Sequence, residues 1–332
     1  MAETINIGEI AVKISDDIFS HFFWEKHKKH DQNFDCVNTD HKTKSGTDEK
    51  KSHPGDILFS YDDPYLNQKI YLHTDLKSYK NDSINTARLR DAFKSLCLTV
   101  ECANQSDSWR AVYSVDASEK HEVRGLLFVH NYDHEYKKNF YDAIERIDLI
   151  NGLPLPKDRV IHFLGPKDIQ RLYNIANDMI RLRFEKKLPD EYTFYYPDQV
   201  MIRRQNDVWG QPATIESMTG PYLIVKHGQD KLGNQGYVIY YNRPGKTVEE
   251  FEYFIDSLSR FQMLDSGEIV KIRVVHDDPA DELKTVFETA KKKYCKAWGL
   301  MASRQEILDA IQIERVTCVT DTYNPGDMGW RE

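Results

Sequence analysis

Apolar and polar residues follow two different periods in the first hundred residues of the chain. Residues 57–61 and 70–72 are rich in β-branched and aromatic side chains, which favours two strands. The segment 62–68 between them has turn-forming residues, so the two strands are expected to form a hairpin. From residue 84 to residue 103 the apolar positions have helical spacing, with Ser83 as the expected N-cap. Such a helix would bury one face against the sheet.

The next ninety residues continue the alternation of strands and helices. Residues 123–130 and 159–164 are expected to be buried strands, separated by a helix over 140–150 and a proline-rich turn around 152–156. A long helix is expected over 168–187. The pattern predicts an α/β domain in which helices pack on a sheet.

A domain boundary is expected where the helical pattern stops at Leu188-Pro189-Asp190. The chain would then consist of a first domain, residues 1–188, and a smaller α+β accessory domain, residues 189–332, without an evident catalytic constellation. No internal repeat is visible in the sequence. The elements expected in the accessory domain are a hairpin of 222–225 with 237–241, a helix over 248–263, a strand over 269–275 and a helix over 282–298.

Two carboxylates are expected to meet at one end of the first hairpin. Asp56, in His53-Pro54-Gly55-Asp56, opens the first strand, and Asp75 lies near the end of the second. Antiparallel pairing brings these positions to the same end, and Lys77 projects from the same face as Asp75 because side chains repeat every two residues. Mg²⁺ takes oxygen ligands and usually keeps several waters, so the two carboxylates with the carbonyl of Leu76 would suffice to hold it.

This arrangement suits the hydrolysis of a phosphodiester. The reaction needs a cation beside the phosphate, a water of lowered pKa and stabilisation of the charge that develops on the phosphorus oxygens. Lys77 could orient the water or offset the charge on the phosphate. The alternative is a solvated strand end with a surface ion pair. The acid-x-Lys pattern by itself is uninformative, because it also occurs at Asp48-Glu49-Lys50, Glu135-Tyr136-Lys137, Glu185-Lys186-Lys187 and Glu282-Leu283-Lys284.

The order of helix, strand, Pro-x-Asp strand, Asp-x-Lys strand and helix resembles the PD-(D/E)XK nuclease superfamily. The resemblance implies the restriction-endonuclease-like fold, an α/β fold with a mixed sheet flanked by helices. The resemblance covers about residues 1–165. It implies a metal-dependent nuclease with a role in restriction, repair or bacterial anti-phage defence. Two departures are the glycine between Pro54 and Asp56, and Asp75 where glutamate is more frequent.

Many members of that superfamily carry a further glutamate early in the first helix. Gly8-Glu9, followed by a hydrophobic helical segment, matches this layout, so the resemblance makes Glu9 the candidate third carboxylate. Glu25 is its competitor. The proposed metal ligands are therefore Asp56, Asp75, Leu76 and Glu9, with Lys77 as the catalytic lysine.

The charge distribution limits how nucleic acid could bind. The formal net charge is −8, whereas phosphate contacts come from clustered lysine and arginine. Nucleic acid is therefore expected to bind at a locally basic part of the surface, or with the help of a partner protein. Local basic stretches occur at 26–30, 42–51, 181–187, 203–204 and 291–293, and the first two flank the proposed site.

The cysteines and the N-terminal segment indicate a reducing compartment. The five cysteines are odd in number and include no Cys-x-x-Cys pair, which argues against a disulfide framework or a zinc ribbon. The spacing of His27, His30 and Cys36 is only loosely that of metal ligands, so these are interpreted as ordinary surface or core residues. No signal-like or membrane-spanning segment is seen, and a cytoplasmic protein without membrane contact is expected.

Together these features predict an endonuclease that uses Mg²⁺ or Mn²⁺ and acts on nucleic acid, DNA rather than RNA. An effector subunit of a defence system, working as a homo-oligomer or with a partner protein, fits the acidic surface. The alternative is a non-catalytic subunit that uses the nuclease fold for binding or assembly.

Overall fold

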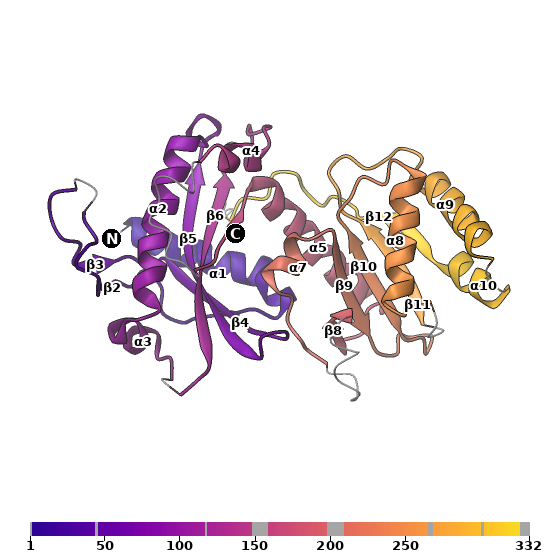
Figure 1. Cartoon of the computed structure of the whole chain (residues 1–332), viewed down its shortest axis with the longest axis horizontal. Helices are drawn as coiled ribbons and strands as arrows, with labels where there is room; N and C mark the ends of the chain where they lie inside the picture. Colours follow the sequence, from indigo (N-terminus) through magenta and orange to yellow (C-terminus); the bar gives the residue numbers. More distant parts are fainter. Residues whose placement is uncertain are drawn as a thin grey trace, which may run out of the picture. The chain divides into compact units, whose positions relative to one another are not determined.

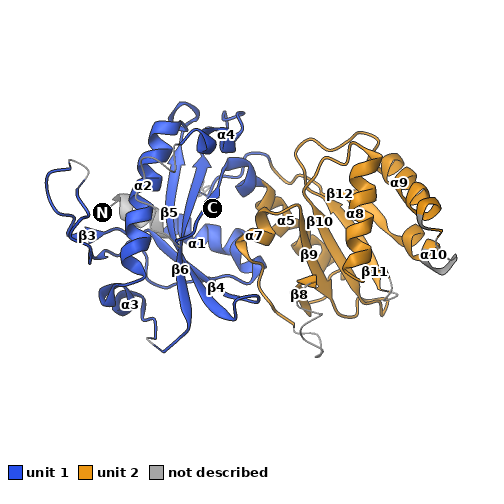
Figure 2. Cartoon of the chain, in the orientation of Figure 1, with its two compact units in different colours: residues 1–170, 321–332 blue, residues 171–320 orange. Residues whose placement is uncertain are grey.

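The computed structural model describes residues 2–43, 46–116, 118–147, 159–197, 209–264, 268–299 and 302–325. The chain forms two compact units, one of residues 1–170 with 321–332 and one of residues 171–320 (Figure 2). The expected turn around 152–156 and the basic pair at 203–204 lie outside the described residues. Among the described helices, none is long and apolar enough to cross a membrane.

The first unit is built on a mixed five-stranded sheet with the strand order β1-β4-β5-β6-β7 (Figure 1). Strands β1, β4 and β5 are antiparallel neighbours, whereas β6 is parallel to both β5 and β7. Its elements are α1 (Ala2–Asp17), η1 (Phe19–Phe22), β1 (Glu25–Lys26), β2 (Phe34–Asp35), β3 (Ser52–His53), β4 (Ile57–Asp63), β5 (Gln68–Tyr79), η2 (Asn81–Ser83), α2 (Thr86–Ala103), α3 (Asp107–Tyr113), β6 (His121–Asn131), α4 (Phe140–Glu145) and β7 (Ile161–Leu164).

Helix α2 covers one face of this sheet and η1 packs on the other. On β6, Leu127 and Val129 belong to a core cluster with α2, while Phe128 meets Phe19 of η1 edge to face. A strand buried on both faces explains the continuous apolar run on β6. Asn85 caps α2 by accepting a hydrogen bond from the Arg88 N–H. The expected cap, Ser83, instead ends the short helix η2, so that expectation was wrong.

The second unit contains another mixed five-stranded sheet, in the order β12-β11-β10-β9-β8. Its helix α8 packs against β10 and β11 through a cluster of buried aromatic and aliphatic side chains. Helix α5 (Pro166–Phe184) belongs to both units. The remaining elements are β8 (Tyr192–Phe194), α7 (Ile215–Thr219), β9 (Tyr222–His227), β10 (Gly236–Tyr241), α8 (Val248–Arg260), β11 (Ile269–Val274), α9 (Leu283–Trp298), α10 (Ala302–Ala310) and β12 (Gln312–Arg315).

The two sheets share one topology. In each, two antiparallel pairings are followed by two parallel pairings, and helices connect the parallel strands. The hairpin β9–β10 therefore occupies in the second sheet the place that β4–β5 occupies in the first. Because the units divide inside α5, the division of the chain between residues 188 and 189 stays a prediction.

Candidate active site

The β4–β5 hairpin brings Asp56 and Asp75 to the same end of the first sheet. The last pair of the hairpin is Ile57 with Thr74, so Asp56 and Asp75 are the next residues beyond it on the two strands. Asp56 accepts a hydrogen bond through Oδ2 from the Leu76 N–H at 2.9 Å. The N–H and C=O of one residue in a strand point to the same side, so the Leu76 carbonyl also faces the end where Asp56 lies.

The backbone that carries Asp56 is held on both sides. The Asp31 N–H donates to the Asp56 carbonyl at 2.9 Å, and the Gln32 N–H donates to the Gly55 carbonyl at 3.0 Å. A Cβ at Gly55 would lie 2.9 Å from His73 Cε1, 3.0 Å from the Gln32 carbonyl oxygen and closer still to the Tyr113 hydroxyl. The glycine between Pro54 and Asp56 is thus required by close packing.

Lys77 completes the group. Its ammonium donates to Asp75 Oδ1, as expected for side chains two residues apart on one face of a strand. The two side chains are mostly buried, with 30% of Lys77 and 17% of Asp75 exposed. The contact is therefore not an ordinary solvated ion pair of the strand end.

The electrostatics of the group favour a bound cation. Burial and then the negative charge of Asp75 raise the pKa of Asp56 to about 7. Burial alone would lower the pKa of Lys77, but Asp75 and Asp56 raise it overall, so the ammonium stays protonated. Two carboxylates that share a site cannot both ionise readily without a positive charge between them. A divalent cation would supply this charge where a proton otherwise does.

The carboxylates open into a large cavity of about 1250 Å³ between α2 and the segment that follows β2. Basic side chains on both sides contribute to its wall, with Lys42 and Lys50 on the segment and Arg88 and Lys94 on α2. The expectation that stretch 42–51 flanks the site is confirmed for these two lysines. Acidic residues also line the cavity, so its wall carries charges of both signs.

Other basic residues have different surroundings. Lys29 donates to the Val112 carbonyl at 2.6 Å and is not among the described residues that line the cavity. Lys291 pairs with Glu288, and Lys293 pairs with Glu249 and Glu252, so their charges are balanced locally.

The two glutamates considered as a third ligand are not grouped with the aspartates by the described contacts. Glu9 is an exposed residue of α1, and Glu25 on β1 lies 3.9 Å from Lys69. Neither is among the described residues that line the cavity. The role of Glu9 stays a prediction.

The second sheet lacks the carboxylate pair at the corresponding place. The last pair of its hairpin is Tyr222 with Tyr241, and the next residues beyond it are Pro221 and Asn242. The acidic group therefore occurs in the first of the two similarly connected sheets and is not repeated at the equivalent hairpin end of the second.

The sequence interpretation missed one further group near this cavity. Cys36 lies with His41, His53 and Cys102, not with His27 and His30. The pair Cys36-x₄-His41 was a weak signal, and no spacing pattern connects it to Cys102 on the distant helix α2.

A mixed sheet with an Asp-x-Lys strand, a Pro-x-Asp strand opener and flanking helices defines a nuclease domain of the PD-(D/E)XK class. Residues 1–168 match the GAPS4 protein PD-(D/E)XK nuclease domain, and the chain belongs to this family. GAPS4 is an anti-phage defence protein. Nucleases of this class typically use a divalent metal, and the domain implies a nucleic-acid substrate. No curated protein and no solved structure matches the chain.

Proposed function

We propose that this protein is an endonuclease that uses Mg²⁺ or Mn²⁺ to hydrolyse phosphodiester bonds of DNA during anti-phage defence. The observation that carries the proposal is the convergence of Asp56, Asp75 and Lys77 in a cavity whose wall includes four further basic side chains, with the Leu76 N–H hydrogen-bonded to Asp56. Asp56, Asp75 and the Leu76 carbonyl would hold the cation. Glu9 would add a carboxylate from α1.

The residues of the chain would act on the substrate around that cation. A bound divalent cation supplies charge neutralisation and a water of lowered pKa. Lys77 stays protonated because of Asp75, so its N–H groups can donate to a phosphate oxygen or orient the attacking water. Lys42, Lys50, Arg88 and Lys94 would hold the flanking phosphates.

The second half of the chain would have an accessory role. Pro221 and Asn242 replace the two carboxylates at the equivalent hairpin end, so residues 189–332 are proposed to recognise substrate, dimerise or dock a partner protein. A partner that supplies further nucleic-acid affinity would also fit the net charge of −8.

The test is a cleavage assay with a substrate panel. Purified full-length protein is incubated with supercoiled plasmid, linear duplex, single-stranded DNA and RNA, with Mg²⁺, with Mn²⁺ or with EDTA. The proposal expects metal-dependent internal cleavage of DNA. Cleavage restricted to RNA would show that the substrate is RNA and not DNA. Cleavage that persists in EDTA would show that the reaction does not need a divalent cation.

Binding without cleavage is the outcome that favours the alternative function. If the folded protein binds DNA in a gel-shift assay but leaves every substrate intact with either metal, the chain is a binding or assembly subunit. Adding lysate of the native host then shows whether a missing partner restores cleavage, which would return the chain to the nuclease role.

A further inference from the structure

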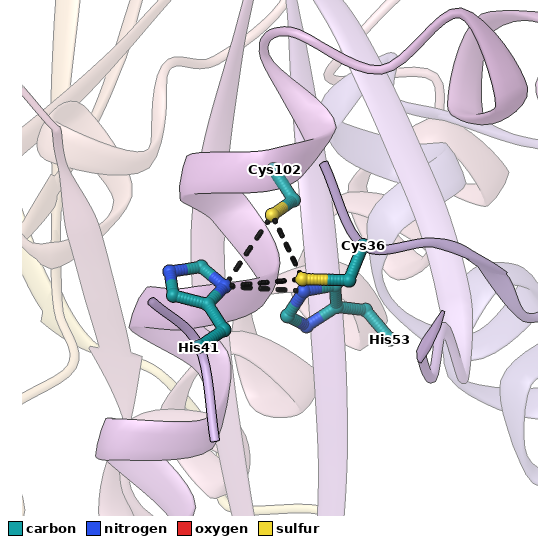
Figure 3. A group of neighbouring side chains, drawn as sticks. All are labelled: Cys36, His41, His53 and Cys102. Carbon is teal, nitrogen blue, oxygen red and sulfur yellow. Dashed lines mark hydrogen bonds between the residues drawn. The ribbon is translucent and has the colours of Figure 1, made fainter. Parts of the chain in front are cut away.

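Four side chains with metal-binding atoms converge (Figure 3), and one of them, His41, also lines the cavity. Cys36 follows β2, His41 lies in the segment after it, His53 ends β3, and Cys102 comes from the last turn of α2. One atom of each residue, Sγ of the cysteines or a ring nitrogen of the histidines, lies within 4.8 Å of the corresponding atoms of the other three. His41, His53 and Cys102 are buried and Cys36 is half-buried.

Four of the six separations between these atoms are close to those of a tetrahedral zinc site. Zn–S bonds of about 2.3 Å and Zn–N bonds of about 2.0–2.1 Å place two sulfurs about 3.8 Å apart, sulfur and nitrogen about 3.5 Å apart, and two nitrogens about 3.3 Å apart. The Sγ atoms of Cys36 and Cys102 are 3.6 Å apart. His41 Nδ1 lies 3.4 Å from each sulfur and 3.4 Å from His53 Nε2.

Hydrogen bonding outside the group orients both imidazoles. His41 Nε2 lies 3.2 Å from a carboxylate oxygen of Glu101, which can only accept while ionised, so Nε2 carries the hydrogen. The Thr99 hydroxyl donates to the Ser95 carbonyl at 2.9 Å and therefore accepts from His53 Nδ1 at 3.3 Å. The lone pairs of His41 Nδ1 and His53 Nε2 then both point into the group. Such outer partners are usual for metal-bound histidines.

Hydrogen bonds alone do not satisfy this arrangement. Two imidazole lone pairs face each other at 3.4 Å with no hydrogen between them. His41 Nδ1 also faces both sulfurs, although one ring nitrogen has a single lone pair to offer. A cation at the centre would contact all four atoms at once and remove the conflict.

We propose that Cys36, His41, His53 and Cys102 bind a structural zinc ion, separate from the metal of the carboxylate site. Four protein ligands close the coordination sphere, so no position is left for a reacting water. A disulfide is the other bond that two neighbouring cysteines could form, but it would leave the two histidine lone pairs opposed. The absence of a Cys-x-x-Cys pair excludes a zinc ribbon, but it does not exclude a site assembled from three distant segments.

The zinc would fasten the segment between β2 and β3 to α2. Asn38 on this segment also donates to Glu101 of α2 at 2.9 Å. Lys42 and Lys50 lie on the fastened segment and line the cavity, and His53 precedes Asp56 by three residues. The ion would therefore hold one wall of the cavity in place opposite the basic residues of α2.

The test measures metal content rather than nuclease activity. Full-length protein purified without added metal is dialysed against metal-free buffer, and zinc is measured by plasma mass spectrometry. The proposal expects about one zinc per chain in the parent. Cys36→Ser and Cys102→Ser should lose it, whereas Cys318→Ser, which removes an exposed thiol elsewhere, and Asp75→Asn should keep it.

A second measurement covers the case in which the cysteine variants do not fold. Parent protein produced in Co²⁺-supplemented medium should show intense visible bands of tetrahedral Co²⁺ and a thiolate-to-cobalt charge-transfer band. A folded parent without stoichiometric zinc and without these bands would overturn the proposal. So would zinc that persists in both cysteine variants and disappears in Asp75→Asn, because that result would place it at the carboxylates.

Discussion

Replacing Asp56 by asparagine should stabilise the metal-free protein at alkaline pH while removing its response to metal. The Asp56 carboxyl has a pKa of about 7 in the fold, against an ordinary value of 3.8, because of burial and the charge of Asp75. Below pH 4 the group is protonated in both folded and unfolded chains and costs nothing. Between pH 4 and pH 7 the unfolded chain ionises first, so the group lowers the free energy of unfolding more and more as the pH rises. This loss of stability is complete above about pH 7.

The size of the effect follows from the same displacement of the pKa. A carboxyl whose pKa moves from 3.8 to about 7 corresponds to a ceiling of about 4 kcal/mol at pH 8. Asp56 is half-buried and interacts electrostatically with both Asp75 and Lys77, and solvent screening reduces this ceiling to roughly 1–2 kcal/mol. Asparagine keeps an oxygen to accept from the Leu76 N–H. The melting temperature should rise by about 2–4 °C for each kcal/mol.

The assay is thermal unfolding of the full chain followed by tryptophan fluorescence, in EDTA and in Mg²⁺ or Mn²⁺, at pH 5 and pH 8. In EDTA, Asp56→Asn should melt above the parent at pH 8 by more than at pH 5. Added metal should raise the melting temperature of the parent and leave that of the variant unchanged. Asp62→Asn is the matched control, since it removes one charge from an exposed position of β4, the strand that follows Asp56, where Asp62 pairs with Lys69.

Two results would refute this reasoning. A parent and an Asp56→Asn variant that melt together at pH 8 in EDTA would show that the carboxylate is not strained by its neighbours. An equal gain in Asp62→Asn would attribute the effect to net charge instead of the site.

Three further predictions concern the cavity wall, the glycine beside the site and the second unit. Replacing Lys42 and Lys50 together by glutamine should weaken DNA binding at low salt, as measured by fluorescence anisotropy. The magnitude of the slope of log K against log salt should fall by about one for each lost phosphate contact, and an unchanged slope would show that the two lysines do not contact phosphates. Gly55→Ala should cost about 1–3 kcal/mol of stability and reduce cleavage, because the added Cβ is crowded on three sides; parental melting and cleavage would contradict that packing. Asp178→Ala should destabilise the second unit by about 3–5 kcal/mol in urea unfolding, since Arg273 donates to both of its oxygens in a buried pair; a loss below 1 kcal/mol would contradict a dry ion pair.

Local pattern was sufficient to predict that Asp56, Asp75 and Lys77 lie close together. The period of two and the direction of a hairpin place Asp56 near Asp75 and Lys77 beside Asp75, and all three are found there. The position of Glu9 depends on how α1 lies against the sheet, which the spacing of its apolar residues does not fix. Asn85 rather than Ser83 caps α2 because the chain first makes one turn of 3₁₀ helix, a feature of tertiary packing.

Long-range features could not be predicted from the sequence. The Cys₂His₂ group requires the segment between β2 and β3 to fold onto the last turn of α2, and no local pattern encodes that contact. The shared topology of the two sheets could not be predicted either, because the two hairpins have different residues at the matching positions: Asp56 and Asp75 in the first sheet, Pro221 and Asn242 in the second.

Whether the carboxylates and Lys77 hydrolyse the phosphodiester is measured by the rate of Mg²⁺-dependent plasmid cleavage under single-turnover conditions. The parent is compared with Asp75→Asn, Lys77→Met and Asp62→Asn. We expect the cleavage rate to fall by about 10²-fold or more in Asp75→Asn and Lys77→Met and to stay at the parental value in Asp62→Asn. Circular dichroism confirms that each variant is folded. Cleavage by folded Asp75→Asn at the parental rate would show that the phosphodiester is hydrolysed elsewhere in the protein.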